Sequence, residues 1–126
     1  MIQQLSDLEL EIMKIVWGNR SEVTLFPYIM EGLAARGKPC QKNALIVLLS
    51  RLINKGFLRA EKIGRHNEYK ALISETEYQT AQTENFLNKI YEGKVKGLVA
   101  NLISGEFLTD EEYEELKKLL EKGRER

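Results

Sequence analysis

The spacing of apolar positions predicts a helix over residues 42–54 followed at once by a short β-hairpin. Gly56 favours a helix stop, because glycine readily adopts the left-handed conformation that follows a last helical turn. Strands are expected at residues 57–62 and 67–70, around a basic loop at residues 63–66. This order of elements is typical of a winged helix. The helix repeats apolar residues at the spacing of one buried face: Leu45, Leu48, Leu49, Leu52 and Ile53.

A first helix is predicted to begin after Ser6, because Ser6 and Glu9 have the spacing of a capping box, with Leu5 and Leu10 placed as a hydrophobic staple. Trp17 closes this helix and is interpreted as a core anchor rather than as a base-stacking residue. The remaining residues of the apolar face are Leu8, Ile12, Ile15 and Val16.

A second helix is predicted before the Gly/Pro turn at residues 37–40, and it buries Ile29, Met30 and Leu33. Residues 21–23 are interpreted as a short strand edge. Thr24 is interpreted as the N-cap of this helix, with Pro27 in its first turn. Two helices joined by such a turn match a helix-turn-helix.

The C-terminal part of the chain is predicted to form three helices over residues 76–91, 94–104 and 109–122. Ser74 or Thr76 caps the first of these helices, and Thr109 caps the last. Short helices with many apolar residues need a partner surface, so a second copy of the chain is expected there. The alternative is that they fold back onto the N-terminal part. The expected dimer interface comprises Phe86, Leu87, Ile90, Tyr91, Val95, Leu98, Val99, Leu102, Ile103, Leu116 and Leu119.

The predicted fold class is therefore mainly α with a small β-hairpin. A winged helix-turn-helix domain is expected over residues 1–72, and a helical dimerisation domain over residues 73–126. The formal net charge of zero averages two unlike parts, because residues 1–72 carry 11 Lys/Arg against 7 Asp/Glu, whereas residues 73–126 carry 8 against 12. Local positive charge favours nucleic acid. A solvated basic face is the alternative.

With the leucine face buried, the rest of the 42–54 helix is predicted to read DNA. Lys42, Asn43 and Ser50 carry groups that bond phosphates or base edges. Ile46 and Val47 offer only contact with thymine methyl groups, or else indicate a helix buried on two sides. Arg51 either reaches a phosphate or forms a surface ion pair. In the hairpin, the predicted DNA contacts are Lys62, Arg65, His66 and Asn67, for which an ordinary polar hairpin tip is the alternative.

Other functions find little support in the composition. One histidine, one cysteine and no Gly-rich phosphate loop predict no enzyme, no metal site and no cofactor. No secretory signal or membrane-inserting segment is expected, and a single cysteine fits a cytoplasmic location. Cys40 is interpreted as a packing residue, with a thiol-responsive regulator as the alternative.

Several segments resemble the penicillinase-repressor (BlaI/MecI/CopY) family of transcriptional regulators. Residues 5–17 are similar to its opening motif, residues 48–56 to the end of its recognition helix, and residues 63–69 to its wing. The similarity continues through residues 86–93 and 98–102, so it covers nearly the whole chain.

The resemblance implies a homodimeric repressor that binds a double-stranded, inverted-repeat operator of a resistance or stress operon. In several members a membrane sensor protease cuts an Asn-Phe bond, and the matching bond here joins Asn101 to Leu102. The copper-responsive branch uses C-terminal cysteines, which residues 73–126 lack. Family members often carry threonines where Ala44 and Val47 stand, so a different operator sequence is expected. The alternative function is a winged-helix protein-interaction module without DNA binding.

Overall fold

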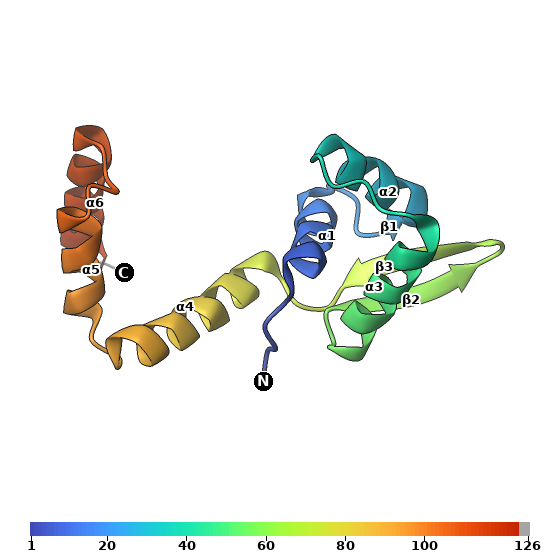
Figure 1. Cartoon of the computed structure of the whole chain (residues 1–126), viewed down its shortest axis with the longest axis horizontal. Helices are drawn as coiled ribbons and strands as arrows, with labels where there is room; N and C mark the ends of the chain where they lie inside the picture. The colour runs from blue at the N-terminus through green and yellow to red at the C-terminus, as the bar shows by residue number, and fades with distance from the viewer. Residues whose placement is uncertain (124–126) are drawn as a thin grey trace. The chain divides into compact units, whose positions relative to one another are not determined.

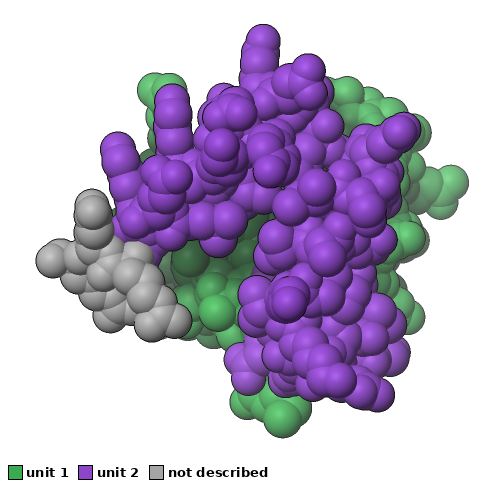
Figure 2. Space-filling model, turned by 90° about the vertical axis from the view of Figure 1, so that its left-hand side faces the viewer, with its two compact units in different colours: residues 1–82 green, residues 83–126 purple. Residues whose placement is uncertain are grey.

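The computed structural model describes residues 1–123, and the chain forms two compact units (Figures 1 and 2). Unit 1 comprises Met1–Gln82, and unit 2 begins at Thr83. The domain boundary predicted from the sequence lies at residues 72/73. The boundary between the two units lies further along the chain, because the first turns of helix α4 (Glu75–Tyr91) belong to unit 1, where the Tyr78 ring is buried.

Helix α1 (Asp7–Gly18) begins with the predicted capping box. The Ser6 hydroxyl accepts a hydrogen bond from the Glu9 N–H at 3.3 Å, and the Ser6 N–H donates to Glu9 Oε1 at 2.8 Å. The prediction that Leu8 is buried was wrong, because its side chain is 42% exposed. Glu9, one position further on, faces inward instead. It shares the buried face with Ile12, Met13, Ile15 and Val16.

The next elements are strand β1 (Thr24–Leu25) and helix α2 (Phe26–Ala35). The predictions of a strand at residues 21–23 and of Thr24 as an N-cap were wrong. Thr24 is buried within β1, and its hydroxyl accepts a hydrogen bond from Asn19 Nδ2 at 3.0 Å. Leu25 is the N-cap residue and provides no side-chain bond, while Pro27 lies in the first turn as predicted. As predicted, α2 packs Ile29, Met30 and Leu33 against the core.

Helix α3 (Lys42–Asn54) buries Leu45, Leu48, Leu49 and Leu52, as predicted. The prediction for Ile53 was wrong, because Ile53 is 38% exposed at the edge of the leucine face. After α3 the chain turns sharply at Gly56, whose φ is +83°. The Phe57 N–H donates to the Leu52 carbonyl at 2.9 Å, which closes the helix end and lets the next strand start immediately.

Strands β2 (Leu58–Ile63) and β3 (His66–Ala71) form the predicted antiparallel hairpin, with Ile63 opposite His66. Strand β1 pairs with the other edge of β3, so the sheet order is β1-β3-β2. Three helices and this small sheet make up a winged helix (Figure 1).

Aromatic residues attach the start of α4 to the core of unit 1. The Tyr78 ring lies 5.5 Å from the Phe57 ring and 5.9 Å from the Trp17 ring, measured between centroids. Trp17 Nε1 also donates to the Ile73 carbonyl at 2.9 Å. The interpretation of Trp17 as a core anchor is therefore confirmed.

Helices α5 (Val95–Ser104) and α6 (Asp110–Lys122) follow α4 in unit 2, close to their predicted bounds. Ser74 rather than Thr76 caps α4, because the Ser74 hydroxyl accepts from the Glu77 N–H at 3.0 Å. Thr109 caps α6 with a full capping box. Among residues 83–123 no side chain is buried. Large apolar side chains that remain exposed there are Phe86, Ile90, Val95, Ile103, Phe107, Tyr113, Leu119 and Leu120.

Candidate nucleic-acid interface

The outward face of α3 carries two rows of exposed side chains, because residues four apart lie one above the other on a helix. One row comprises Lys42, Ile46 and Ser50, and the other comprises Asn43, Val47 and Arg51. Ile46 is 46% exposed and Val47 is 51% exposed. Within residues 1–123, α3 is therefore buried on one side only.

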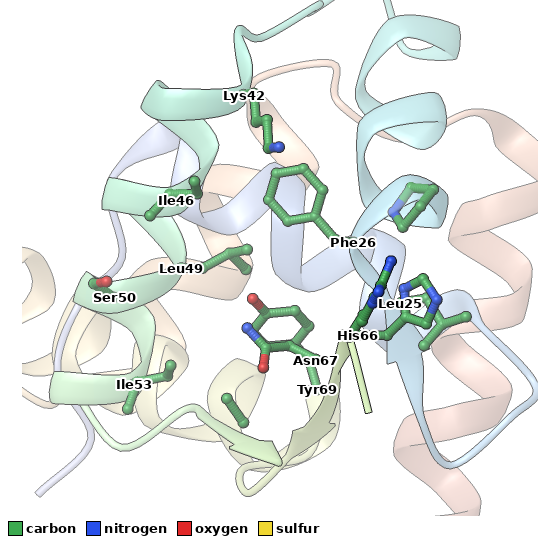
Figure 3. A pocket seen from close by; sticks show the side chains of 13 residues that line it. Leu25, Phe26, Lys42, Ile46, Leu49, Ser50, Ile53, His66, Asn67 and Tyr69 are labelled. Atoms are coloured by element: carbon green, nitrogen blue, oxygen red, sulfur yellow. The ribbon is translucent and has the colours of Figure 1, made fainter. Parts of the chain in front are cut away.

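A groove of about 450 Å³ lies between α3, the first turn of α2 and the hairpin, which forms the wing of unit 1 (Figure 3). Six of the predicted DNA-contacting residues line this groove together. They are Lys42, Ile46 and Ser50 from α3, and Arg65, His66 and Asn67 from the hairpin.

Four predicted residues, Asn43, Val47, Arg51 and Lys62, do not line the groove, although all four are exposed. The start of α2 also lines this groove, at Leu25, Phe26 and Pro27, and was not predicted from the sequence. No local pattern in the sequence indicates it, because the position of Phe26 in the groove depends on how α2 packs beside α3. Other lining residues that were not predicted are Leu49, Ile53, Ala60 and Tyr69.

The charges on this surface are positive and unpaired. Within the part of the chain that the structure describes, Lys42, Arg51 and Arg65 form no ion pair with a carboxylate. The first turn of α3 contains no acidic residue, and its N-cap Gln41 makes no side-chain bond. The first N–H groups of α3 are therefore available to an anion beside the Lys42 ammonium.

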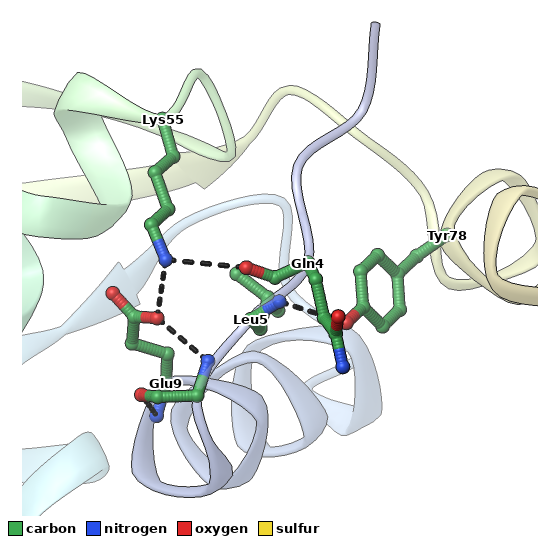
Figure 4. A network of polar contacts seen from close by, with 6 residues as sticks. Gln4, Leu5, Glu9, Lys55 and Tyr78 are labelled. Carbon is green, nitrogen blue, oxygen red and sulfur yellow. Dashed lines mark hydrogen bonds and ion pairs between the residues drawn. The ribbon is translucent and has the colours of Figure 1, made fainter. Parts of the chain in front are cut away.

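An ion pair between the buried Glu9 carboxylate and the partly exposed Lys55 holds the C-terminal end of α3 against α1 (Figure 4). Lys55 Nζ lies 2.7 Å from Glu9 Oε1 and also donates to the Gln4 carbonyl at 3.2 Å. The Leu5 N–H in turn donates to Tyr78 Oη at 3.0 Å. The N-terminal segment thus links the end of α3 to the start of α4.

The Glu9 carboxyl is charged at neutral pH despite its burial. Burial raises its pKa, but hydrogen bonds from Lys55 and Ser6, together with the charge of Lys55, lower the pKa by more. The net pKa lies below the ordinary value of 4.5. The pair therefore joins a buried carboxylate to a partly exposed lysine at the edge of the core of unit 1.

The other predicted site residues occupy separate positions. Cys40 is a free, partly buried thiol before α3. Asn101 and Leu102 lie within α5, where Asn101 Nδ2 donates to Tyr91 Oη at 2.9 Å. In residues 1–123 no cluster of three potential metal ligands occurs. Likewise, no helix over that range is long and apolar enough to cross a bilayer.

The fold and the cationic face of α3 place the chain among winged-helix proteins. The structure resembles the DNA-binding domain of the repressor BlaI, with a TM-score of 0.52 and 32% sequence identity, over 62% of this chain and 92% of that one. It also resembles the monomeric form of Bacillus licheniformis BlaI solved in complex with the blaP half-operator. That match has a TM-score of 0.50 and 33% identity over the same shares of the two chains. The predicted winged helix is thereby confirmed.

The chain belongs to the penicillinase repressor family, whose model matches residues 5–122. It is 34% identical to the penicillinase repressor of Bacillus licheniformis, over 99% of this chain and 95% of the relative. It is 30% identical to the methicillin resistance regulatory protein MecI of Staphylococcus aureus strain N315, over 94% of each chain. The family consists of transcriptional repressors, so the chain is not an enzyme.

Proposed function

We propose that this chain is a sequence-specific DNA-binding repressor that acts as a homodimer on an inverted-repeat operator of a resistance or stress operon. The observation that carries the proposal is the groove between α3 and the wing, where residues from two separate elements converge on one cationic face. The solved complex of the relative BlaI with a half-operator supports DNA as the ligand.

The chemistry of this face divides into two roles. Lys42, Arg65 and the free N–H groups at the start of α3 suit phosphate oxygens, which position a protein on DNA. Asn43 and Ser50 carry donors and acceptors that suit base edges. His66 and Asn67 extend the same face along the wing, and Arg51 and Lys62 add positive charge beyond the groove.

The exposed apolar side chains of unit 2 support a dimer. The apolar side chains of this unit are exposed or only partly buried along three helices, and apolar faces of this kind favour association. Two copies present two α3 helices to two half-sites, which greatly increases specificity over a single small helix.

Relief of repression is proposed to occur by cleavage of the Asn101–Leu102 bond by a membrane sensor protease. Asn101 is exposed and Leu102 is partly buried within α5. Proteases bind extended chain, so α5 has to open locally before the bond is cut. Loss of α5 would remove part of the proposed dimer interface and weaken operator binding.

The test begins with selection of duplexes from a random pool by the purified full-length chain. Affinity for the selected duplex is then measured by fluorescence anisotropy at several salt concentrations. We expect Lys42→Glu and Arg65→Glu each to weaken binding and to lower the log–log salt slope by about one. Lys14→Glu on α1, remote from the groove, is the matched charge-reversal control and is expected to bind as wild type does.

A protein-interaction module without DNA binding is the second candidate, favoured by the exposure of Ile46 and Val47. The selection experiment separates the two functions. If no duplex is enriched at low salt, the repressor proposal fails. If enrichment occurs and both groove variants lose affinity while Lys14→Glu does not, the interaction module is excluded as the main function.

A further inference from the structure

The centre of the exposed face of α3 is apolar. Ile46 lies one helical turn after Lys42 and one turn before Ser50, and Val47 has the same place between Asn43 and Arg51. Both side chains are about half exposed, whereas the leucines on the opposite face fill the core. Ile46 and Val47 therefore contribute less to the packing of unit 1 than the leucines do, and polar residues stand one turn before and one turn after each of them on α3.

The chemistry of the major groove restricts what such side chains recognise. Base edges in this groove present hydrogen-bond donors and acceptors, and the C5 methyl group of thymine is the apolar exception. An aliphatic side chain placed over a donor or acceptor removes water from it without replacing the hydrogen bond, which is unfavourable. The same side chain placed over a thymine methyl group buries apolar surface on both partners.

We propose that Ile46 and Val47 determine operator specificity by contacting thymine methyl groups in each half-site. The inference rests on the proposed DNA-binding function and adds the base that these residues recognise. Consecutive helical residues are separated by about 1.5 Å of rise and by roughly 100° around the axis. The two side chains therefore reach neighbouring positions of the groove, and we expect one or two thymines in each half-site to be read in this way.

The test removes single methyl groups from the DNA. Each thymine of the selected duplex is replaced in turn by uracil, which keeps the Watson–Crick pair and loses only the C5 methyl group. Affinity is measured for the wild-type chain and for Ile46→Ala and Val47→Ala. Both variants keep the helix, because alanine has a higher helix propensity than isoleucine or valine. Leu72→Ala, at an apolar residue of unit 1 that is 54% exposed and does not line the groove, is the matched control.

We expect uracil at one or two positions to weaken wild-type binding roughly fourfold per methyl group. At those positions Ile46→Ala or Val47→Ala should bind the thymine and uracil duplexes equally, while Leu72→Ala should retain the fourfold difference. If uracil has the same effect on wild type and on both alanine variants, the thymine-reading role is wrong, although specific DNA binding still stands. If no duplex is enriched in the selection, both the inference and the proposed function fail.

Discussion

Replacing Lys55 by methionine is expected to destabilise unit 1, because it leaves the buried Glu9 carboxylate without its cation. The two side chains meet at 2.7 Å, with the Glu9 side chain 2% exposed and the Lys55 side chain 26% exposed. Methionine is unbranched and flexible, so it fills much of the space that the lysine stem occupies. The main change is therefore the loss of one charge and its hydrogen bonds.

The size of the effect follows from the burial of the pair. Removing one partner of a fully buried ion pair costs about 3–5 kcal/mol. Lys55 is partly exposed, so water already screens some of its interaction with Glu9. The Ser6 N–H also remains as a hydrogen-bond donor to Glu9. We therefore expect the free energy of unfolding to fall by about 2–3 kcal/mol at neutral pH.

The loss should also depend on pH. In the wild-type chain folding lowers the pKa of Glu9, so its stabilising contribution is present above pH 4.5 and is lost as the pH falls through the lower, folded-state value. In the Lys55→Met variant the carboxyl is still buried but has no cation, so folding should raise its pKa. Protonation of Glu9 then removes the unpaired buried charge, so the variant loses less stability at low pH. The two proteins should differ most at neutral pH and converge in acid.

The assay is urea unfolding followed by the fluorescence of Trp17, the single tryptophan, which packs on Tyr78 in unit 1. Lys14→Met, at an exposed position of α1, is the control and should lie within about 0.5 kcal/mol of wild type. A loss for Lys55→Met that is no larger than the control, or one that is equal at neutral and acidic pH, would refute the reasoning.

Three further substitutions test the packing of unit 1 and the association of unit 2. Gly32→Ala should lower the free energy of unfolding by about 1–3 kcal/mol, because the added Cβ would lie 2.9 Å from Ile15 Cδ1. Gly18→Ala is the control and should be tolerated, because its Cβ would meet no atom within 4 Å. Tyr78→Phe should lower the free energy of unfolding by about 1–3 kcal/mol in urea unfolding, because a buried N–H of the N-terminal segment loses its acceptor. Leu119→Asp, at a side chain that is 67% exposed, should raise the dimer dissociation constant roughly tenfold or more in analytical ultracentrifugation.

Local rules predicted much of the fold because they involve residues close in sequence. The capping boxes at Ser6 and Thr109 formed as their spacing indicates, and the leucine repeat gave the buried face of α3. The hairpin followed from Gly56, Gly64 and the two β-rich runs around the basic loop. The class of fold and most of the outward-facing residues of α3 were therefore predictable.

The errors arose where contacts between distant residues decided the outcome. Leu8 fits the apolar pattern of α1, but Glu9 takes the inward position because Lys55, far along the chain, neutralises it. Thr24 looks like a helix cap, but pairing with Tyr69 in β3 draws it into the sheet. The contribution of Phe26 to the groove likewise depends on how α2 meets α3, which no local pattern encodes.

The two units differ in how they bury apolar side chains, and this difference bears on the proposed relief of repression. The buried hydrophobic residues of residues 1–123 all lie in unit 1, so its core is complete within one chain. Helix α5 has only 10 residues, which is too short for stability without tertiary packing. We therefore expect the order of unit 2 to depend on association with a second copy. A signal that opens α5 would then separate the two winged helices of the proposed dimer, although each of them stays folded. Operator binding would be lost because the two half-sites are no longer bound by two linked domains.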